Sequence, residues 1–130
     1  MILSAGHWTG KGSLLLEGRS LGEDVLADAD VEEDEGGVSV RVALTLADKT
    51  LQLIVRVASN EVGTYIVNVR SDFAASLIGT AKLDSEPNLG LLWNESGSLH
   101  LTFTLFSHSA GLVTVFEDCV CLGFCSYLVN

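Results

Sequence analysis

Apolar and polar residues alternate with a period of two along most of this chain. Between positions 38 and 46, valine or leucine occupies every second place, and Ser39, Arg41, Ala43 and Thr45 fill the places between them. The same alternation recurs over residues 51–57, 65–69 and 99–105. Because successive side chains of a strand point to opposite faces, the pattern predicts half-buried antiparallel strands.

Turn-forming residues separate the alternating segments at the short spacing of a meander. Ala47-Asp48-Lys49, Ser59 to Gly63 and Asn94 to Gly97 are three such places. We predict nine or ten strands, at about 8–17, 23–33, 37–46, 50–58, 63–70, 76–83, 89–94, 98–106, 111–118 and 120–128. One flat sheet cannot hide so many apolar faces, so the chain is expected to be all-β and to close on itself. An antiparallel up-and-down β-barrel of about 8–10 strands is the expected form, with a two-sheet sandwich as the alternative.

One segment leaves room for a helix. Residues 71–77 could form a single helical turn capped by Ser71-Asp72 and ended by Gly79, or a bulged start of a strand. The chain shows no internal repeat, linker or low-complexity tract. Residues 1–130 are therefore expected to form a single domain.

The composition adds more apolar surface than a small core needs. Hydrophobic residues make up 48% of the 130 residues and charged residues 18%, with a mean hydropathy of +0.39. The surplus can line an internal cavity, or it can be buried against another subunit.

The charge balance excludes several partners. A formal net charge of −10 and a pI near 4.4 argue against nucleic acid and against an anionic membrane surface, which both require basic residues. The first residues lack the basic and apolar regions of a secretion signal, and no uncharged apolar span reaches 18 residues. We therefore expect a cytoplasmic protein with no membrane span.

The densest charge lies between Glu23 and Glu35. Asp28, Asp30, Glu32 and Asp34 share one strand face, and such a density of oxygen ligands could hold a hard cation. The spacing does not match an EF-hand loop. A solvated strand face that protects a sheet edge is the favoured interpretation, and cation binding is left open.

Cysteine and histidine offer little chemistry in this sequence. Cys119, Cys121 and Cys125 are one ligand short of a typical zinc site and are expected to be buried free thiols. His100 has polar strand neighbours and could point into a cavity, whereas His108 falls in a turn. No nucleophile–base or paired-carboxylate motif accompanies them, so we predict neither an enzyme nor a metal site.

Aromatic and basic side chains supply the candidate ligand contacts. Trp8 and Trp93 could stack on a ligand or close the ends of a core, and closing the core is the favoured role. A ligand in the interior is expected to lie against residues of one strand parity, with polar side chains as its anchors. The candidate ligand-binding residues are Trp8, Arg41, Arg56, Tyr65, Trp93 and His100.

The opening stretch Gly6-His7-Trp8-Thr9-Gly10-Lys11-Gly12 resembles the first strand of the calycin superfamily, which includes lipocalins, fatty-acid-binding proteins and nitrobindin-like barrels. The resemblance implies a barrel with Trp8 near one end. It also implies ligand-contacting basic residues late in the chain, but no Lys or Arg follows Lys82. Haem is possible in nitrobindin-like proteins, but their C-terminal histidine is missing, because the last one here is His108. No cofactor is therefore predicted.

Three functions follow from these observations. The first is a barrel that binds a small apolar molecule in its interior. The alternative is a structural or protein-interaction module, in which side chains fill the barrel and the surplus apolar surface forms a homodimer. An enzyme that uses His100 in the barrel mouth is the least favoured.

Overall fold

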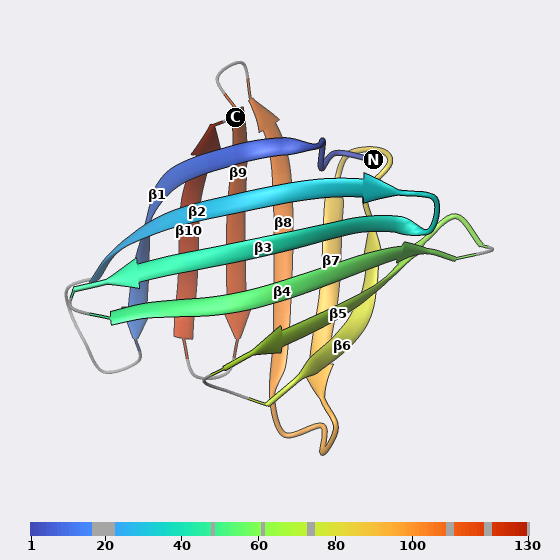
Figure 1. The fold of residues 1–130 in the computed structure, drawn as a ribbon. Helices are drawn as coiled ribbons and strands as arrows, with labels where there is room; N and C mark the ends of the chain where they lie inside the picture. The colour runs from blue at the N-terminus through green and yellow to red at the C-terminus, as the bar shows by residue number, and fades with distance from the viewer. Residues whose placement is uncertain are drawn as a thin grey trace.

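The computed structural model of the chain is a closed antiparallel barrel in which each strand pairs with its neighbours in the sequence (Figure 1). The structure describes residues 1–16, 23–47, 49–60, 62–72, 75–108, 111–118 and 121–129, and for residues 14–16 and from 106 onward it describes the backbone. The strands are β1 (Gly6–Leu16), β2 (Glu23–Asp34), β3 (Gly37–Leu46), β4 (Lys49–Ser59), β5 (Tyr65–Ser71), β6 (Leu77–Lys82), β7 (Asn88–Asn94), β8 (His100–His108), β9 (Gly111–Asp118) and β10 (Cys121–Val129).

The ends of the chain close the barrel. β1 pairs with β10 from Thr9↔Val129 to Leu16↔Cys121, and on its other side β1 pairs with β2. The prediction of an all-β up-and-down barrel is confirmed. All ten predicted strands are present, and each begins and ends within two residues of its predicted position.

The described part of the chain contains no helix. Where a helical turn was an option, Ser71 ends β5 and Leu77 begins β6. Phe73 and Ala74 lie outside the described residues.

The barrel wall has an apolar inner face and an outer face that is mainly polar on β2 and more apolar on β5, β6 and β7. Val25, Ala27, Ala29 and Val31 of β2 are buried, and the residues between them are exposed. The four acidic residues that were expected to share a strand face therefore lie on the outside. Because apolar and polar residues alternate strictly on β2, one face of the strand packs on the core and the other faces solvent.

One end of the barrel contains most of the buried core among the described residues, and we call it the closed end. It is the end at which β2 is followed by β3, β4 by β5 and β6 by β7. The N-terminal segment lies there, since the Ile2 amide donates to the Leu83 carbonyl (2.9 Å) and the Trp8 indole N–H donates to the Ser4 carbonyl (3.0 Å). The buried core cluster consists of Trp8, Ala29, Val31, Val38, Val40, Val57, Tyr65, Val67, Ala81, Leu83, Leu92, Phe103 and Leu105.

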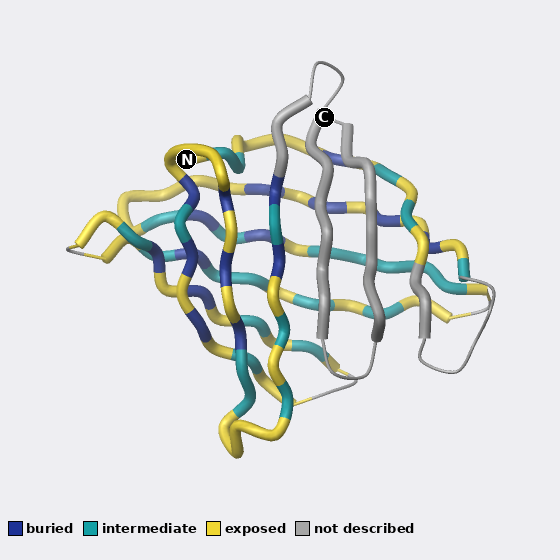
Figure 2. Tube along the Cα trace, turned by 180° about the vertical axis from the view of Figure 1, so that it is seen from behind, coloured by how far each residue is buried: buried dark blue, intermediate teal, exposed yellow. Residues whose placement is uncertain are grey.

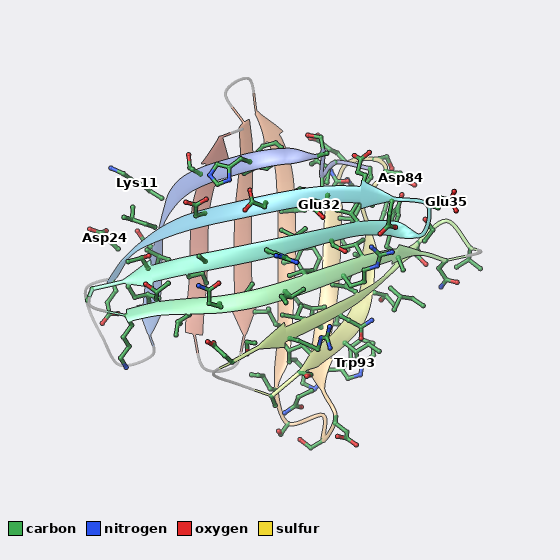
Figure 3. All side chains as sticks on the ribbon, in the orientation of Figure 1. Lys11, Asp24, Glu32, Glu35, Asp84 and Trp93 are labelled. Carbon is green, nitrogen blue, oxygen red and sulfur yellow. The ribbon has the colours of Figure 1, made fainter. Side chains whose placement is uncertain are left out.

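The opposite end, which we call the open end, is the end at which β3 is followed by β4, β5 by β6 and β7 by β8. The two ends are separated by the length of the strands. Asp24 lies near the open end, and Glu35 and Asp84 lie near the closed end (Figure 3). Buried residues gather toward the closed end, and partly exposed residues become common toward the open end (Figure 2).

Candidate ligand site

Four leucines line the inner wall at the open end, on the hairpin of β3 and β4. Leu44 and Leu46 continue the parity of Val38 and Val40 along β3. Leu51 and Leu53 have the parity of buried Val57 on β4. Residues directly opposite one another share a face, and Leu44 pairs with Leu51. All four therefore face the barrel interior.

The four leucines lie beyond the packed core. The partly buried residues packed against the core cluster end at Val42 on β3 and Val55 on β4. The leucines come next along both strands, and each is only partly buried. Large apolar side chains on the inside of a barrel are usually enclosed, so their partial exposure means that the described side chains do not fully cover the inner wall here.

The inner wall of β2 differs from that of β3 and β4. Val25 of β2 lies level with Leu46 and Gly12, yet it is only 1% exposed. Ala27 nearby is also buried. Among the residues whose side chains the structure describes, the partly exposed inner apolar surface lies on β3 and β4 and extends to Val69 of β5, Leu77 of β6 and Leu101 of β8.

The number of strands sets the width of the barrel interior. A barrel's diameter grows with the number of strands, and eight strands already give an interior that side chains just fill or that holds one small ligand. Ten strands enclose a wider interior. At the closed end this width is filled by aromatic side chains such as Trp8, Tyr65 and Phe103. At the open end the described inner wall offers leucine and valine alone from Val42 to Val55, which reach less far.

Two of the six predicted ligand contacts face the interior. Trp8 and Tyr65 are each 8% exposed and belong to the core cluster at the closed end. The Tyr65 hydroxyl donates to Asp84 Oδ1 (2.5 Å). This bond raises the pKa of Tyr65, with a further rise from burial, and it lowers the pKa of the Asp84 carboxyl. Both aromatics are therefore occupied in closing the barrel.

The other four predicted contacts lie on the outer wall and do not face the interior, where the ligand was expected. Their role as ligand contacts stays a prediction. Arg41 and Arg56 alternate with the inward-facing residues of β3 and β4. Trp93 and His100 are cross-strand partners on β7 and β8, with buried Leu92 and Phe103 on the opposite parity. These residues were selected for their chemistry, but they share the parity of the solvated face.

Arg56 is held in an ion pair on that wall. Its guanidinium contacts both carboxylate oxygens of Asp34 (2.8 and 2.9 Å) and donates to Ser39 Oγ (2.9 Å). Asp34 also accepts the amide N–H groups of Gly36 and Gly37. The hydrogen bond from Arg56, followed by those amides, lowers the pKa of Asp34 to about 2. Arg56 therefore anchors the β2–β3 turn.

The acidic outer face of β2 engages a histidine. His7 of β1 places Nδ1 2.7 Å from Asp30 and Nε2 2.7 Å from Asp28. The hydrogen bond to Asp30 and the two negative charges raise the pKa of His7. The two carboxylates contact different ring nitrogens, so they do not converge on one point. Among the described residues no group of three or more His, Cys, Asp or Glu side chains could hold a metal ion.

The structure does not describe the side chains of the three cysteines and of His108. Cys119 lies outside the described residues, and Cys121 and Cys125 belong to β10. His108 is the last residue of β8 and pairs with Gly111. The expectation of buried free thiols therefore stays a prediction.

A hollow of about 690 Å³ lies on the wall formed by β1, β2 and β3. Its lining includes Lys11, Leu26 and Asp28, which are exposed outer-wall residues. None of the four inner leucines lines it. It is an open surface groove, distinct from the barrel interior.

The four leucines are not among the predicted ligand contacts, which were all aromatic or basic side chains. Their signal was present in the sequence, since they share the parity of the neighbouring valines, and leucine replaces valine toward the hairpin tip.

Comparisons of the chain with protein-family models, curated proteins and solved structures found no match. No helix within the described residues is long and apolar enough to cross a membrane.

Proposed function

We propose that this protein binds a small apolar molecule inside its barrel, at the open end. The observation that carries the proposal is the set of four inward-facing leucines left partly exposed beyond the core. Covering apolar surface is worth about 25 cal/mol per Å², so an apolar molecule seated against them would gain free energy that the free protein lacks. The resemblance of Gly6 to Gly12 to calycin barrels supports the same function.

The closed end would act as the floor of this site. Core residues such as Val40, Val57 and Val67 are already enclosed, so a ligand has no need to displace them. Its contacts would instead be made with Leu44, Leu53 and the half-buried valines of the same wall. A pre-formed site of this kind is typical of small-molecule pockets.

A titration with Nile red, an uncharged dye whose emission rises in apolar surroundings, tests the proposal. Leu53→Asn and Ile54→Asn make a matched pair, because Leu53 faces the interior while its neighbour is 45% exposed on the outer wall. We expect Leu53→Asn to weaken dye binding by about tenfold or more and Ile54→Asn to leave it unchanged. Absence of dye binding by the unaltered protein, or equal effects of the two variants, would overturn the proposal.

A second candidate function, self-association, rests on apolar residues of the outer wall. Ile66, Ile78, Leu89 and Leu91 of β5, β6 and β7 are 37–46% exposed. They form one patch, since Thr80 pairs with both Ile66 and Leu91, and Ile78 pairs with Trp93. A second copy of the chain could cover this patch.

Light scattering at micromolar concentration distinguishes the candidates. A dimer that dissociates on Leu91→Glu, while Nile red binding persists, would support self-association alongside ligand binding. A protein that stays monomeric at all concentrations would contradict self-association and would leave the ligand-binding proposal standing.

A further inference from the structure

We infer that the ligand of the open end is an uncharged apolar molecule and not a carboxylate such as a fatty acid. The inference rests on the proposed function. It follows from where the barrel places its few positive charges relative to the interior wall.

The positive charges of the central strands lie outside. Arg41, Arg56 and Arg70 hold the outer parity of β3, β4 and β5. Lys82 is next to buried Ala81 and donates to the carbonyls of Ser85 and Pro87 on the outer side of the β6–β7 turn. Lys11 is likewise an exposed outer-wall residue of β1. None of these five can reach a group seated within the barrel.

The remaining strands supply no replacement. The chain has seven Lys and Arg residues, and none follows Lys82, so β8, β9 and β10 contain none. Arg19 lies outside the described residues. Lys49 begins β4 opposite Leu46 and so has the inner parity of the strand. It is exposed and lies at the rim of the open end, where it is the described cation nearest the leucines.

The described inner wall carries charge only near the strand ends, where Glu23 and Lys49 have the inner parity at the open end and Glu33 has it at the closed end. Its uncharged polar side chains include Ser71, which pairs with Leu53, and two asparagines. Asn88 is 3% exposed at the closed end, where its amide nitrogen reaches the carbonyls of Leu83 and Ser85 (3.1 and 3.2 Å). Asn94 donates to Ser98 Oγ and accepts the Leu99 amide N–H in the turn after β7. A carboxylate held inside the barrel, away from the rim, would be desolvated without a cation among these residues, which is strongly unfavourable.

The rim of the open end disfavours a carboxylate that stays at the mouth. Asp24, Asp72 and Glu95 are exposed at this end, against Lys49 as the described cation. Asp118, the last residue of β9, pairs with Leu101 at the same level. With a formal net charge of −10 on the whole chain, the local potential adds repulsion for anions. The open end therefore favours binding of the hydrocarbon part of a ligand and disfavours binding of a negatively charged group.

Displacement of Nile red by dodecanol and by dodecanoate tests the inference on the unaltered protein. At pH 8 we expect dodecanol to displace the dye at a concentration about 1,000-fold lower than dodecanoate, because only about one acid molecule in 1,000 is protonated at that pH. If the acid binds only in its protonated form, its apparent affinity rises about tenfold for each unit of pH decrease between pH 8 and 6. Dodecanol affinity over the same range serves as the control for effects on the protein.

The outcomes separate this inference from the function on which it rests. Equal affinities at pH 8, with no pH dependence for dodecanoate, would overturn the inference and leave apolar binding standing. Failure of both compounds to displace the dye would overturn the proposed function, and the inference with it.

A charge introduced on the inner wall gives a second test. Leu53→Lys places a cation on the inner parity, and Gln52→Lys places one on the exposed outer face of the same strand. We expect Leu53→Lys to reduce the preference for dodecanol by about tenfold or more and Gln52→Lys to leave it unchanged. An unchanged preference in a folded Leu53→Lys protein would contradict the inference.

Discussion

Val57 and Leu83 at the closed end are each 2% exposed, whereas Leu44 and Leu53 at the open end of the same inner wall are partly exposed. Both regions follow the same apolar–polar alternation, so the alternation does not cause the difference. At the closed end the N-terminal segment bonds to Leu83, and aromatic side chains fill the width of the barrel. At the open end no described segment does the same. The alternation therefore determines which side chains face the interior. Whether an end of the interior is packed depends on the segments and the large side chains that cover it.

The largest expected effect contrasts two leucines. Leu83→Ala should lower the free energy of unfolding by about 3 kcal/mol, because it leaves a cavity among enclosed side chains. Leu53→Ala should cost about 1 kcal/mol, because its side chain is already partly in water. Urea unfolding of the two variants measures both values. Equal losses would show that the open end is as well packed as the closed end.

A smaller effect is expected at the polar contact that holds the closed end. Tyr65→Phe removes the hydrogen bond to Asp84 and should lower the melting temperature near neutral pH by about 4 °C. The pKa of Asp84 is lowered in the folded protein, so its contribution is present above the ordinary value of 3.8 and is lost as the pH falls through the folded value.

The pH dependence provides the control for that variant. Melting curves between pH 7 and pH 3 should show a shallower acid decline for Tyr65→Phe than for the unaltered protein. Parallel declines in the two proteins would contradict a role for this contact.

The open end should allow a small stabilisation at its hairpin. Ala47 adopts a φ of 50°, a left-handed conformation that is unfavourable for any residue with a Cβ, and its side chain is exposed. Ala47→Gly should raise the free energy of unfolding by about 0.5 kcal/mol, because relief of that strain exceeds the added flexibility of the unfolded chain. Urea unfolding checks the value, and a loss of stability would contradict the assignment of strain to this turn.

The outer wall should respond to pH without altering either end. The pKa of His7 is raised by its hydrogen bond to Asp30 and by the charge of Asp28, so its contribution to stability is complete below 6.5 and is lost as the pH rises through the folded value. An NMR titration should place its midpoint above 6.5. Asp30→Asn should bring the midpoint down, and an unchanged midpoint would contradict the contact.

Most of the architecture could be predicted from the sequence, because it depends on local alternation and on turns. The strands, their order and the inward parity of Val38 to Leu46 all follow from the period of two. The candidate site could be predicted only in part. Arg41, Trp93 and His100 were chosen as ligand contacts for their chemistry, although their parity already placed them with the solvated residues. Which end is open depends on the N-terminal segment meeting Leu83, a contact between residues far apart in the sequence that periodicity does not encode.

The most direct test of the central claim is an NMR titration of leucine methyl groups with dodecanol. Leu44, Leu46, Leu51 and Leu53 line the open end, whereas Leu26, Leu89 and Leu91 are exposed on the outer wall and Leu83 is enclosed at the closed end. A site at the open end predicts saturable shifts of the first group, with the outer leucines and Leu83 unchanged. Shifts confined to the outer leucines, or no saturable shift at all, would contradict an apolar site inside the barrel.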